Sequence, residues 1–146
     1  MTIRPFEVAD KDALLAVFKM NVPDFFAPHE ADEFEEYLKL YGSTYFTLKK
    51  ENRIVGGVGY TIKGHEGSIT WIFLDPSCSR SGMGKHAVEH CLSVLSSNKQ
   101  VTAFVVRTSQ LAYAFFEKFG YRVIYTEKDY WGKGLDLYQM EMSNKH

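Results

Sequence analysis

The fold depends on the stretch Leu74-Asp75-Pro76-Ser77-Cys78-Ser79-Arg80-Ser81-Gly82-Met83-Gly84-Lys85. Residues 68–74, which lead into it and include Leu74, are apolar on both faces and predict a buried central strand that ends at Asp75-Pro76. A helix is predicted directly after the glycines, because Val88, Cys91, Leu92 and Leu95 share one face. A strand that runs through such a loop into a helix leaves backbone N–H groups unpaired at the positive helix end. The stretch therefore predicts a phosphate-binding turn, to which Arg80 and Lys85 add side-chain charge.

The rest of the chain supplies the elements of one mixed sheet. The expected strands cover residues 2–6, 45–48, 54–62, 68–74, 101–106, 121–126 and 135–142. Four helices are expected. The first follows an N-cap at Asp10, the second covers Phe34 to Tyr41, and the third follows Gly84. The fourth follows a cap at Ser109 and has Leu111 among its core residues. The order β-α-α-β-β-β-α-β-α-β-β predicts a single α/β domain over residues 1–146. Its sheet should be mixed and mostly antiparallel, with helices on both faces.

Composition and charge narrow the class of partner. The 146 residues carry 17 Lys+Arg and 18 Asp+Glu, a net charge of −1, which argues against nucleic acid and anionic membrane surfaces as partners. No apolar run is long enough to span a bilayer, and charges interrupt residues 1–12, so we expect a cytoplasmic protein. Cys78 and Cys91 lack the spacing of a disulfide framework or thiolate metal site and are expected to be unpaired thiols.

Two other motifs have competing interpretations. Gly82-x-Gly84-x-x-Ala87 fits a dinucleotide-binding fingerprint, but that fingerprint belongs in the first turn of a repeated βαβ fold and here follows half the chain. His86-x-x-Glu89-His90 spells a zinc-hydrolase motif. Both histidines lie opposite the apolar stripe of their helix, so we expect a solvent-exposed pair and no metal site.

Two spaced motifs resemble the GNAT superfamily of N-acetyltransferases. The first is Leu74-x-Pro76-x-x-Ser79-x-x-Gly82-x-Gly84, which is similar to the acetyl-CoA pyrophosphate loop of that family. The second is Ser109-x-x-Ala112-x-x-x-Phe116-x-Lys118-x-Gly120-Tyr121, and the opening Ile3-Arg4-Pro5-Phe6 also fits. The resemblance implies acetyl-CoA as co-substrate, direct acetyl transfer to a primary amine, and a sheet splayed between the strands at 68–74 and 101–106.

The resemblance also assigns cofactor-binding residues. They are Phe73, Leu74, Ser79, Arg80, Ser81, Gly82, Met83, Gly84, Lys85, Ser109, Ala112 and Phe116. Two of these depart from the family pattern. Ser79 stands where Arg or Gln is usual, and Phe116 replaces a tyrosine proposed in relatives to protonate the departing thiolate.

The catalytic candidates follow from those departures. Tyr113 is the nearest phenol that could replace the missing proton donor, although core packing is the simpler interpretation. Glu66 is the candidate general base, with His65 and Asp75 as alternatives that act directly or through water. A solvated turn carboxylate is the simpler interpretation of Glu66.

The acceptor site is predicted between an acidic helix and an aromatic hairpin. Glu30 begins the acidic side, which is either a solvated face or a rim that attracts an amine, and Tyr130 with Trp131 would form the opposite rim. This combination predicts a small-molecule amine as partner. A weaker similarity, from Asp129 through Asp136 to Met140, points to protein N-terminal acetyltransferases. A catalytically weak acyl-CoA-binding sensor or scaffold, an unrelated α/β binding module and a homodimer remain open.

Overall fold

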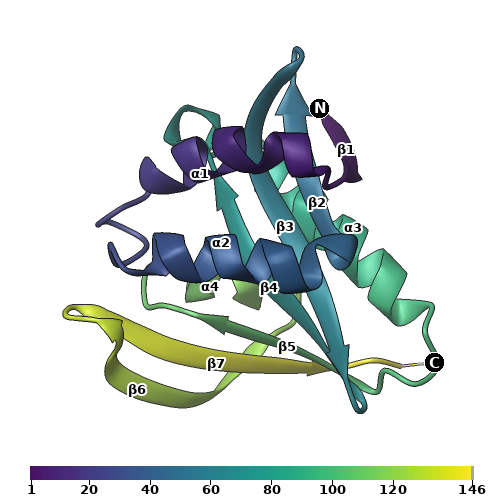
Figure 1. Ribbon diagram of the computed structural model, residues 1–146. Helices are drawn as coiled ribbons and strands as arrows, with labels where there is room; N and C mark the ends of the chain where they lie inside the picture. Colours follow the sequence, from purple (N-terminus) through teal and green to yellow (C-terminus); the bar gives the residue numbers. More distant parts are fainter. Residues whose placement is uncertain (146) are drawn as a thin grey trace.

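The computed structural model describes residues 1–145 and contains one seven-stranded sheet with helices on both faces (Figure 1). The strands are β1 (Thr2–Pro5), β2 (Tyr45–Lys50), β3 (Arg53–Lys63), β4 (Glu66–Leu74), β5 (Ala103–Thr108), β6 (Arg122–Gly132) and β7 (Leu135–Ser143). The α-helices are α1 (Lys11–Lys19), α2 (Glu30–Tyr41), α3 (Met83–Ser96) and α4 (Tyr113–Glu117). Short 3-10 turns are η1 (Val8–Asp10), η2 (Gly42–Thr44) and η3 (Pro76–Cys78). The predicted order of helices and strands is confirmed.

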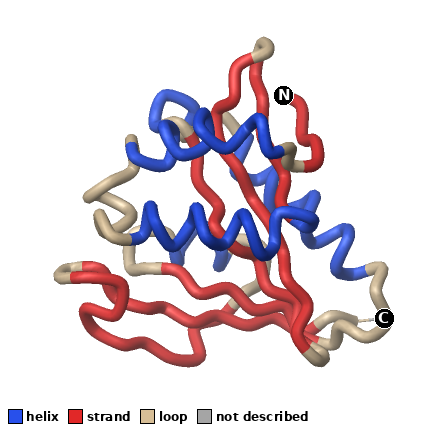
Figure 2. The backbone as a smooth tube through the Cα atoms, viewed as in Figure 1, coloured by secondary structure: helices blue, strands red, loops and turns tan. Residues whose placement is uncertain are grey.

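The sheet has the order β1-β2-β3-β4-β5-β7-β6, and β4 with β5 form the parallel pair among otherwise antiparallel neighbours. Helices α1 and α2 cover one face, and α3 and α4 cover the other (Figures 1 and 2). The predicted fold class is therefore confirmed. The parallel pair at the centre requires a crossover, which α3 supplies behind the sheet.

Each face of the sheet has its own core. On the α1–α2 face, Phe18, Phe34 and Phe73 pack together with ring centroids 5.2 to 5.3 Å apart. On the α3–α4 face the core is mainly aliphatic and includes Val88, Leu95 and other buried residues. Cys78 and Cys91 are buried free thiols in this second core, as expected.

Asp10 anchors the first strand instead of capping α1 with its side chain. It stands at the predicted N-cap position, but its carboxylate accepts hydrogen bonds from the Arg4 guanidinium at 2.7 and 2.8 Å and from the Thr47 hydroxyl at 2.9 Å. It also accepts the backbone N–H of Glu7 at 2.9 Å. These partners, with Arg4 the strongest, lower the pKa of Asp10 to about 2. The predicted cap is thus corrected to a buried ion pair.

Several predicted boundaries are wrong. The strand expected at 101–106 is β5, which begins at Ala103, and β6 continues to Gly132, so the second hairpin turn shrinks to Lys133-Gly134. β6 can extend because its pairing with β7 is interrupted between Glu127 and Gly132 and then resumes. Ser109 does not cap α4 directly; its hydroxyl accepts the N–H of Leu111 one turn earlier, and Leu111 is 51% exposed rather than in the core.

Candidate active site

The central feature of the site is a gap between the two parallel strands. β4 and β5 pair from Glu66 with Ala103 to Ile69 with Val106, and no pairing between them follows in the described chain. β4 stays in the sheet through β3 as far as Leu74, while β5 stays paired to β7 as far as Thr108. The inner edges of both strands therefore separate, which confirms the splay implied by the family resemblance.

A bulge in β4 marks the point where the gap opens. Trp71 has a positive φ of 44°, and the β3–β4 register shifts between Gly57 and Gly59. Tyr45 holds this bulge, because its buried hydroxyl donates a hydrogen bond to the Trp71 carbonyl at 2.6 Å. The Tyr45 side chain lies across two glycines, where an added Cβ would clash with the Tyr45 hydroxyl at Gly57 and come within 2.5 Å of the Tyr45 ring at Gly59. Neither the bulge nor its tyrosine was predicted, although the run Gly56-Gly57-Val58-Gly59 signals close packing on this strand.

The backbone of Leu74 faces the gap. The N–H of Asp75 donates to the Val55 carbonyl of β3 at 2.6 Å. Backbone groups alternate in direction along a strand, so those of Leu74 point away from β3 and toward the gap. Asn21, at the end of α1, already donates its side-chain amide to the Leu74 carbonyl at 3.0 Å. Phe73 is buried among the aromatic rings of the α1–α2 face.

The predicted phosphate-binding turn lies at the open end of β4. Arg80 and Gly82 are both in the left-handed region, with φ of 67° and 84°, and α3 begins at Met83 without a side-chain cap. Within residues 1–145, the backbone N–H groups of Gly82, Gly84 and Lys85 donate no hydrogen bond to the protein. Free N–H donors that lie together at a helix N-terminus form an anion site.

Side chains of the loop itself hold this turn in place through hydrogen bonds to neighbouring loop residues. The Ser79 hydroxyl donates to the Pro76 carbonyl at 2.9 Å, and the Ser81 hydroxyl donates to the Cys78 carbonyl. Asp75 accepts the N–H and hydroxyl of Ser77 at 2.9 and 2.8 Å, and these bonds lower its pKa. Both predicted serines, Ser79 and Ser81, therefore hold the loop with their side chains, and their backbone N–H groups also donate within it, to the Pro76 and Cys78 carbonyls at 3.2 and 3.3 Å.

The turn has room for a phosphate group. A Cβ added at Gly82 would meet nothing within 4 Å, so the space beside this residue is open. A Cβ at Gly84 would instead point inward, 3.5 Å from the Phe115 ring and 3.7 Å from Leu74. The Arg80 and Lys85 side chains are exposed beside the opening, whereas the Met83 side chain is buried in the core.

Helix α4 places the second motif against the core. Phe116 is 1% exposed and contacts the Tyr121 ring edge-on, with centroids 5.8 Å apart. Ala112 is the N-cap of α4, and its N–H donates to the Ser109 carbonyl at 3.1 Å. Tyr113 is half-buried and stacks on Tyr138 with centroids 4.7 Å apart, which agrees with the packing role considered for it.

The structure does not bring the predicted bases to the gap. Glu66 is exposed at the opposite, closed end of β4, where the pairing with β5 begins. His65 lies in the turn before it and contacts the Gln100 carbonyl at 2.9 Å. Asp75 is engaged by Ser77 and by Arg53 at 2.9 Å, and its lowered pKa makes it a weaker base.

A hydroxyl pair that was not predicted lies next to the point where the strands part. Thr70 is the first β4 residue beyond the last β4–β5 pair, and its hydroxyl lies 2.6 Å from the phenol of Tyr37 on α2. Burial raises the pKa of Tyr37 to about 12, so this phenol stays neutral. Sequence reasoning assigned Tyr37 to the core face of its helix, and the bulge that turns Thr70 toward it leaves no periodic signal.

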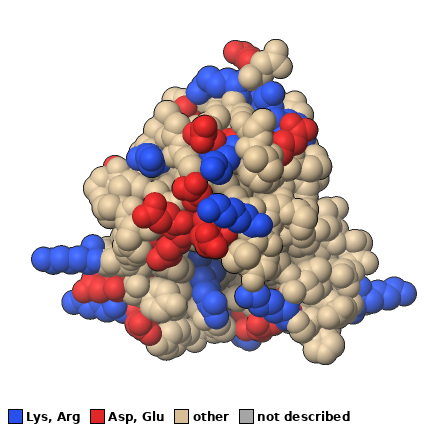
Figure 3. Space-filling model, in the orientation of Figure 1, with Lys and Arg blue, Asp and Glu red and all other residues tan. Residues whose placement is uncertain are grey.

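The predicted acidic rim needs a correction at its first residue. Glu30 is 3% exposed, and its carboxylate accepts the N–H of Ala27 at 2.8 Å inside the α1–α2 loop. Burial raises its pKa. The exposed carboxylates are Asp32, Glu33 and Glu36, and Figure 3 shows acidic side chains gathered over α2. Glu30 itself is a loop-stabilising residue.

The aromatic hairpin lies against the α1–α2 loop. A Cβ at Gly132 would be 3.0 Å from Ala27, so the two segments touch. Trp131 is half-buried and donates its indole N–H to the Thr108 carbonyl, at the end of β5, at 3.1 Å. Tyr130 is 49% exposed and meets the Trp131 ring edge-on at 4.9 Å. The hairpin thus lies beside the end of β5, where β5 is no longer paired to β4.

The prediction that both histidines of the α3 motif are solvent-exposed is correct for His86 and wrong for His90. His86 is exposed, and His90 is half-buried against the Phe46 ring with centroids 4.6 Å apart. Residues 1–145 contain no group of three or more His, Cys, Asp or Glu side chains that could hold a metal ion. In the same described range, no helix is long and apolar enough to cross a membrane.

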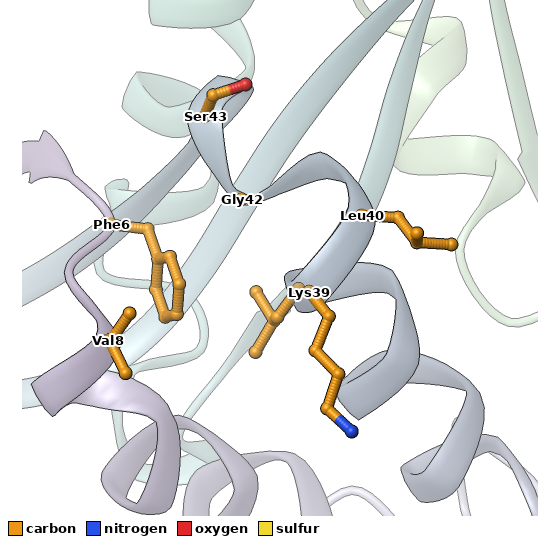
Figure 4. Close-up of a pocket in the computed structure, with 7 residues that line it drawn as sticks. Phe6, Val8, Lys39, Leu40, Gly42 and Ser43 are labelled. Atoms are coloured by element: carbon orange, nitrogen blue, oxygen red, sulfur yellow. The ribbon is translucent and has the colours of Figure 1, made fainter.

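A surface hollow of about 330 Å³ lies away from this gap, beside the end of α2 (Figure 4). Its lining residues are Phe6, Val8, Leu38, Lys39, Leu40, Gly42 and Ser43. It holds neither the free N–H groups nor the unpaired strand edges, so we place the candidate active site at the gap.

Comparisons with known proteins agree with this geometry. The family model for the acetyltransferase (GNAT) family matches residues 14–121. A Bacillus subtilis (strain 168) protein with the provisional name of an acetyltransferase is 31% identical over 93 residues, which span 63% of this chain and 63% of that protein.

Solved structures share the fold at low sequence identity. The ribosomal-protein-S18-alanine N-acetyltransferase of Escherichia coli has a TM-score of 0.82 and 19% identity, with 99% of this chain and 94% of that chain covered. An aminoglycoside 6'-N-acetyltransferase complexed with coenzyme A has a TM-score of 0.78 and 15% identity, with 100% and 98% covered. The fold of this chain is thus shared with these acetyltransferases of known structure. This chain belongs to the GNAT acetyltransferase family.

Proposed function

We propose that this protein transfers an acetyl group from acetyl-CoA to the primary amine of a small molecule, without a covalent enzyme intermediate. The observation that carries the proposal is the loss of β4–β5 pairing after Ile69 and Val106, directly beside the open turn at Gly82. An anion site next to an unpaired strand edge suits a ligand that combines a pyrophosphate with an amide-bearing arm.

The residues present fit that ligand. The backbone N–H groups of Gly82, Gly84 and Lys85 would bind the pyrophosphate, and the Arg80 and Lys85 side chains would add positive charge. The backbone of Leu74 at the gap would hydrogen-bond the arm. When bound, acetyl-CoA supplies an acetyl group activated as a thioester. Ser79 is not needed as an anchoring side chain, because backbone donors make most of the site.

The reaction is a direct displacement. The amine nitrogen uses its lone pair to form a bond to the acetyl carbon, and the carbon–sulfur bond breaks with its electron pair leaving on sulfur. The nitrogen loses one proton and the sulfur gains one, so the products are an N-acetyl amine and free CoA thiol. Holding the two reactants in line within the gap accounts for most of the acceleration.

The nearby side chains orient the amine and leave proton transfer to water. The Thr70 and Tyr37 hydroxyls, 2.6 Å apart, can accept a hydrogen bond from the amine at the apex of the gap. Phe116 has no proton to give, and thiols ordinarily titrate near pH 8.5, so a thiolate can depart without a general acid at a reduced rate.

A binding protein without turnover is the second candidate, and the buried phenyl ring of Phe116 favours it. The test that separates the two is acceptor-dependent release of free CoA thiol across amines, amino acids and peptides, with acetyl-CoA binding measured by calorimetry. We expect binding and release with at least one small amine. Binding without release for any acceptor would support the sensor, and absence of binding at millimolar acetyl-CoA would contradict both.

A further inference from the structure

We propose that Arg107 selects an acceptor that carries a carboxylate next to its amine. This inference rests on the proposed function and names the substrate class of the same site. Arg107 lies on β5 one residue beyond Val106, the last residue paired to β4. It therefore borders the gap on the side opposite Thr70, which is the first unpaired residue of β4.

The side chain of Arg107 is on the acceptor face of the sheet. Phe104 and Val106 belong to the core on the α3–α4 face, and side chains alternate along a strand, so Arg107 points to the α1–α2 face. Thr70 is on this same face, because its hydroxyl contacts Tyr37 of α2. Thr70 and Arg107 directly follow the last β4–β5 pair, Ile69 with Val106, so they flank the beginning of the gap from its two sides.

The guanidinium of Arg107 is oriented but not neutralised. Its Nε donates to the Gln139 side-chain oxygen at 3.3 Å, and the side chain is exposed. No carboxylate within residues 1–145 forms an ion pair with it, and its two terminal nitrogens have no hydrogen-bond partner in that range. A guanidinium held through Nε presents its remaining N–H groups as a fork that matches a carboxylate.

The surroundings describe the rest of the acceptor. An amine that hydrogen-bonds the Thr70–Tyr37 pair would turn a carboxylate on its adjacent carbon toward Arg107 on the other side of the gap. Trp71 is half-buried on the same face and stacks on Phe26 with centroids 6.2 Å apart, which supplies an apolar wall. The acceptor is thus an α-amino acid or a close analogue. The acidic face of α2 had suggested a purely cationic acceptor, whereas Arg107 favours one that also carries a negative charge. The exposed carboxylates of α2 lie on the helix surface.

The test uses matched acceptors that differ by one carboxylate. The pairs are L-phenylalanine with phenethylamine, L-leucine with 3-methylbutylamine and L-lysine with 1,5-diaminopentane, each assayed for acetylation by the full chain. Binding of the same compounds is measured by calorimetry on protein saturated with CoA. The variants are Arg107→Gln, Arg107→Lys and, as a control, Arg122→Gln at an exposed arginine on β6.

We expect the carboxylate member to be preferred in at least one pair. Arg107→Gln should raise its KM about tenfold while kcat and acetyl-CoA affinity change less than about twofold, and should leave the decarboxylated amine unaffected. Arg107→Lys should recover part of the loss, and Arg122→Gln should match wild type. Preference for the decarboxylated amines, or for a peptide amide that begins with alanine, would overturn the proposed role of Arg107 but would still support the proposed acetyltransferase activity. Failure of every amino acid both to bind and to react would overturn that role as well.

Discussion

Gly82→Val is expected to weaken acetyl-CoA binding strongly in a protein that still folds. Gly82 has a φ of 84°, and a side chain added there would enter the open space beside this residue. A valine in this region carries backbone strain of about 1 to 3 kcal/mol, so the variant should also be less stable. The effect on the ligand must therefore be separated from the effect on the fold.

Gly64→Val is the matched control for that strain. Gly64 has a φ of 61°, nothing lies within 4 Å of an added Cβ, and it forms the β3–β4 turn at the closed end of β4. Both variants should lose similar free energy of unfolding, measured by urea denaturation. Only Gly82→Val should weaken acetyl-CoA binding, because only its side chain lies at the proposed phosphate site.

The magnitude follows from the backbone donors at the turn. Hydrogen bonds to a charged group contribute about 1.5 kcal/mol each at the lower end, so losing two weakens binding by about 3 kcal/mol. That difference corresponds to about a 150-fold rise in Kd, readily resolved by calorimetry. Wild-type affinity in Gly82→Val, or equal weakening in Gly64→Val, would refute the placement of the pyrophosphate.

Two further predictions concern the proton donor and the buried ion pair. Phe116→Tyr should raise kcat with little change in acetyl-CoA affinity if the ring borders the thioester, because the phenol restores a proton donor. An unchanged kcat in assays of thiol release would assign Phe116 to the core alone. Asp10→Asn should lower the free energy of unfolding by about 2 kcal/mol at pH 7, because the pKa of Asp10 is depressed from 3.8 to about 2. This stabilisation is present above pH 4 and is lost as the pH falls through 2. The denaturation curves of wild type and Asp10→Asn should therefore converge in acid. A difference in free energy of unfolding that stays constant with pH would contradict the ion pair.

The glycine turn was predictable because its signal is local. Few structures other than a strand-turn-helix fit a strand that is apolar on both faces, then a proline, then two glycines before an amphipathic helix. The separation of the two parallel strands was predicted from the motifs that resemble the GNAT family. Arg107 was also within reach of sequence reasoning. Its neighbours Phe104 and Val106 are apolar, so strand alternation places the arginine on the opposite face.

Other features depend on contacts that periodicity does not record. Glu30 lies in an acidic run and was expected to be solvated, yet it is buried and accepts a hydrogen bond from the backbone N–H of Ala27, a loop residue three positions earlier. Glu66 was proposed as a base because it begins the central strand, but the gap opens at the other end of that strand. The bulge at Trp71 places both Thr70 and Trp71 on one face, which breaks the period of two.

The tyrosine that lies across the β3 glycines links three positions that are distant in the sequence. Tyr45 fills the volume that Gly57 and Gly59 leave vacant, so an alanine at either glycine is tolerated only with a smaller residue at 45. That smaller residue would also remove the hydroxyl that holds the Trp71 carbonyl. Relatives that keep the tyrosine should therefore keep both glycines, and those that lose it should change all three together. Anyone redesigning this sheet has to treat these positions as one unit, since altering any of them singly closes or misplaces the opening between the strands.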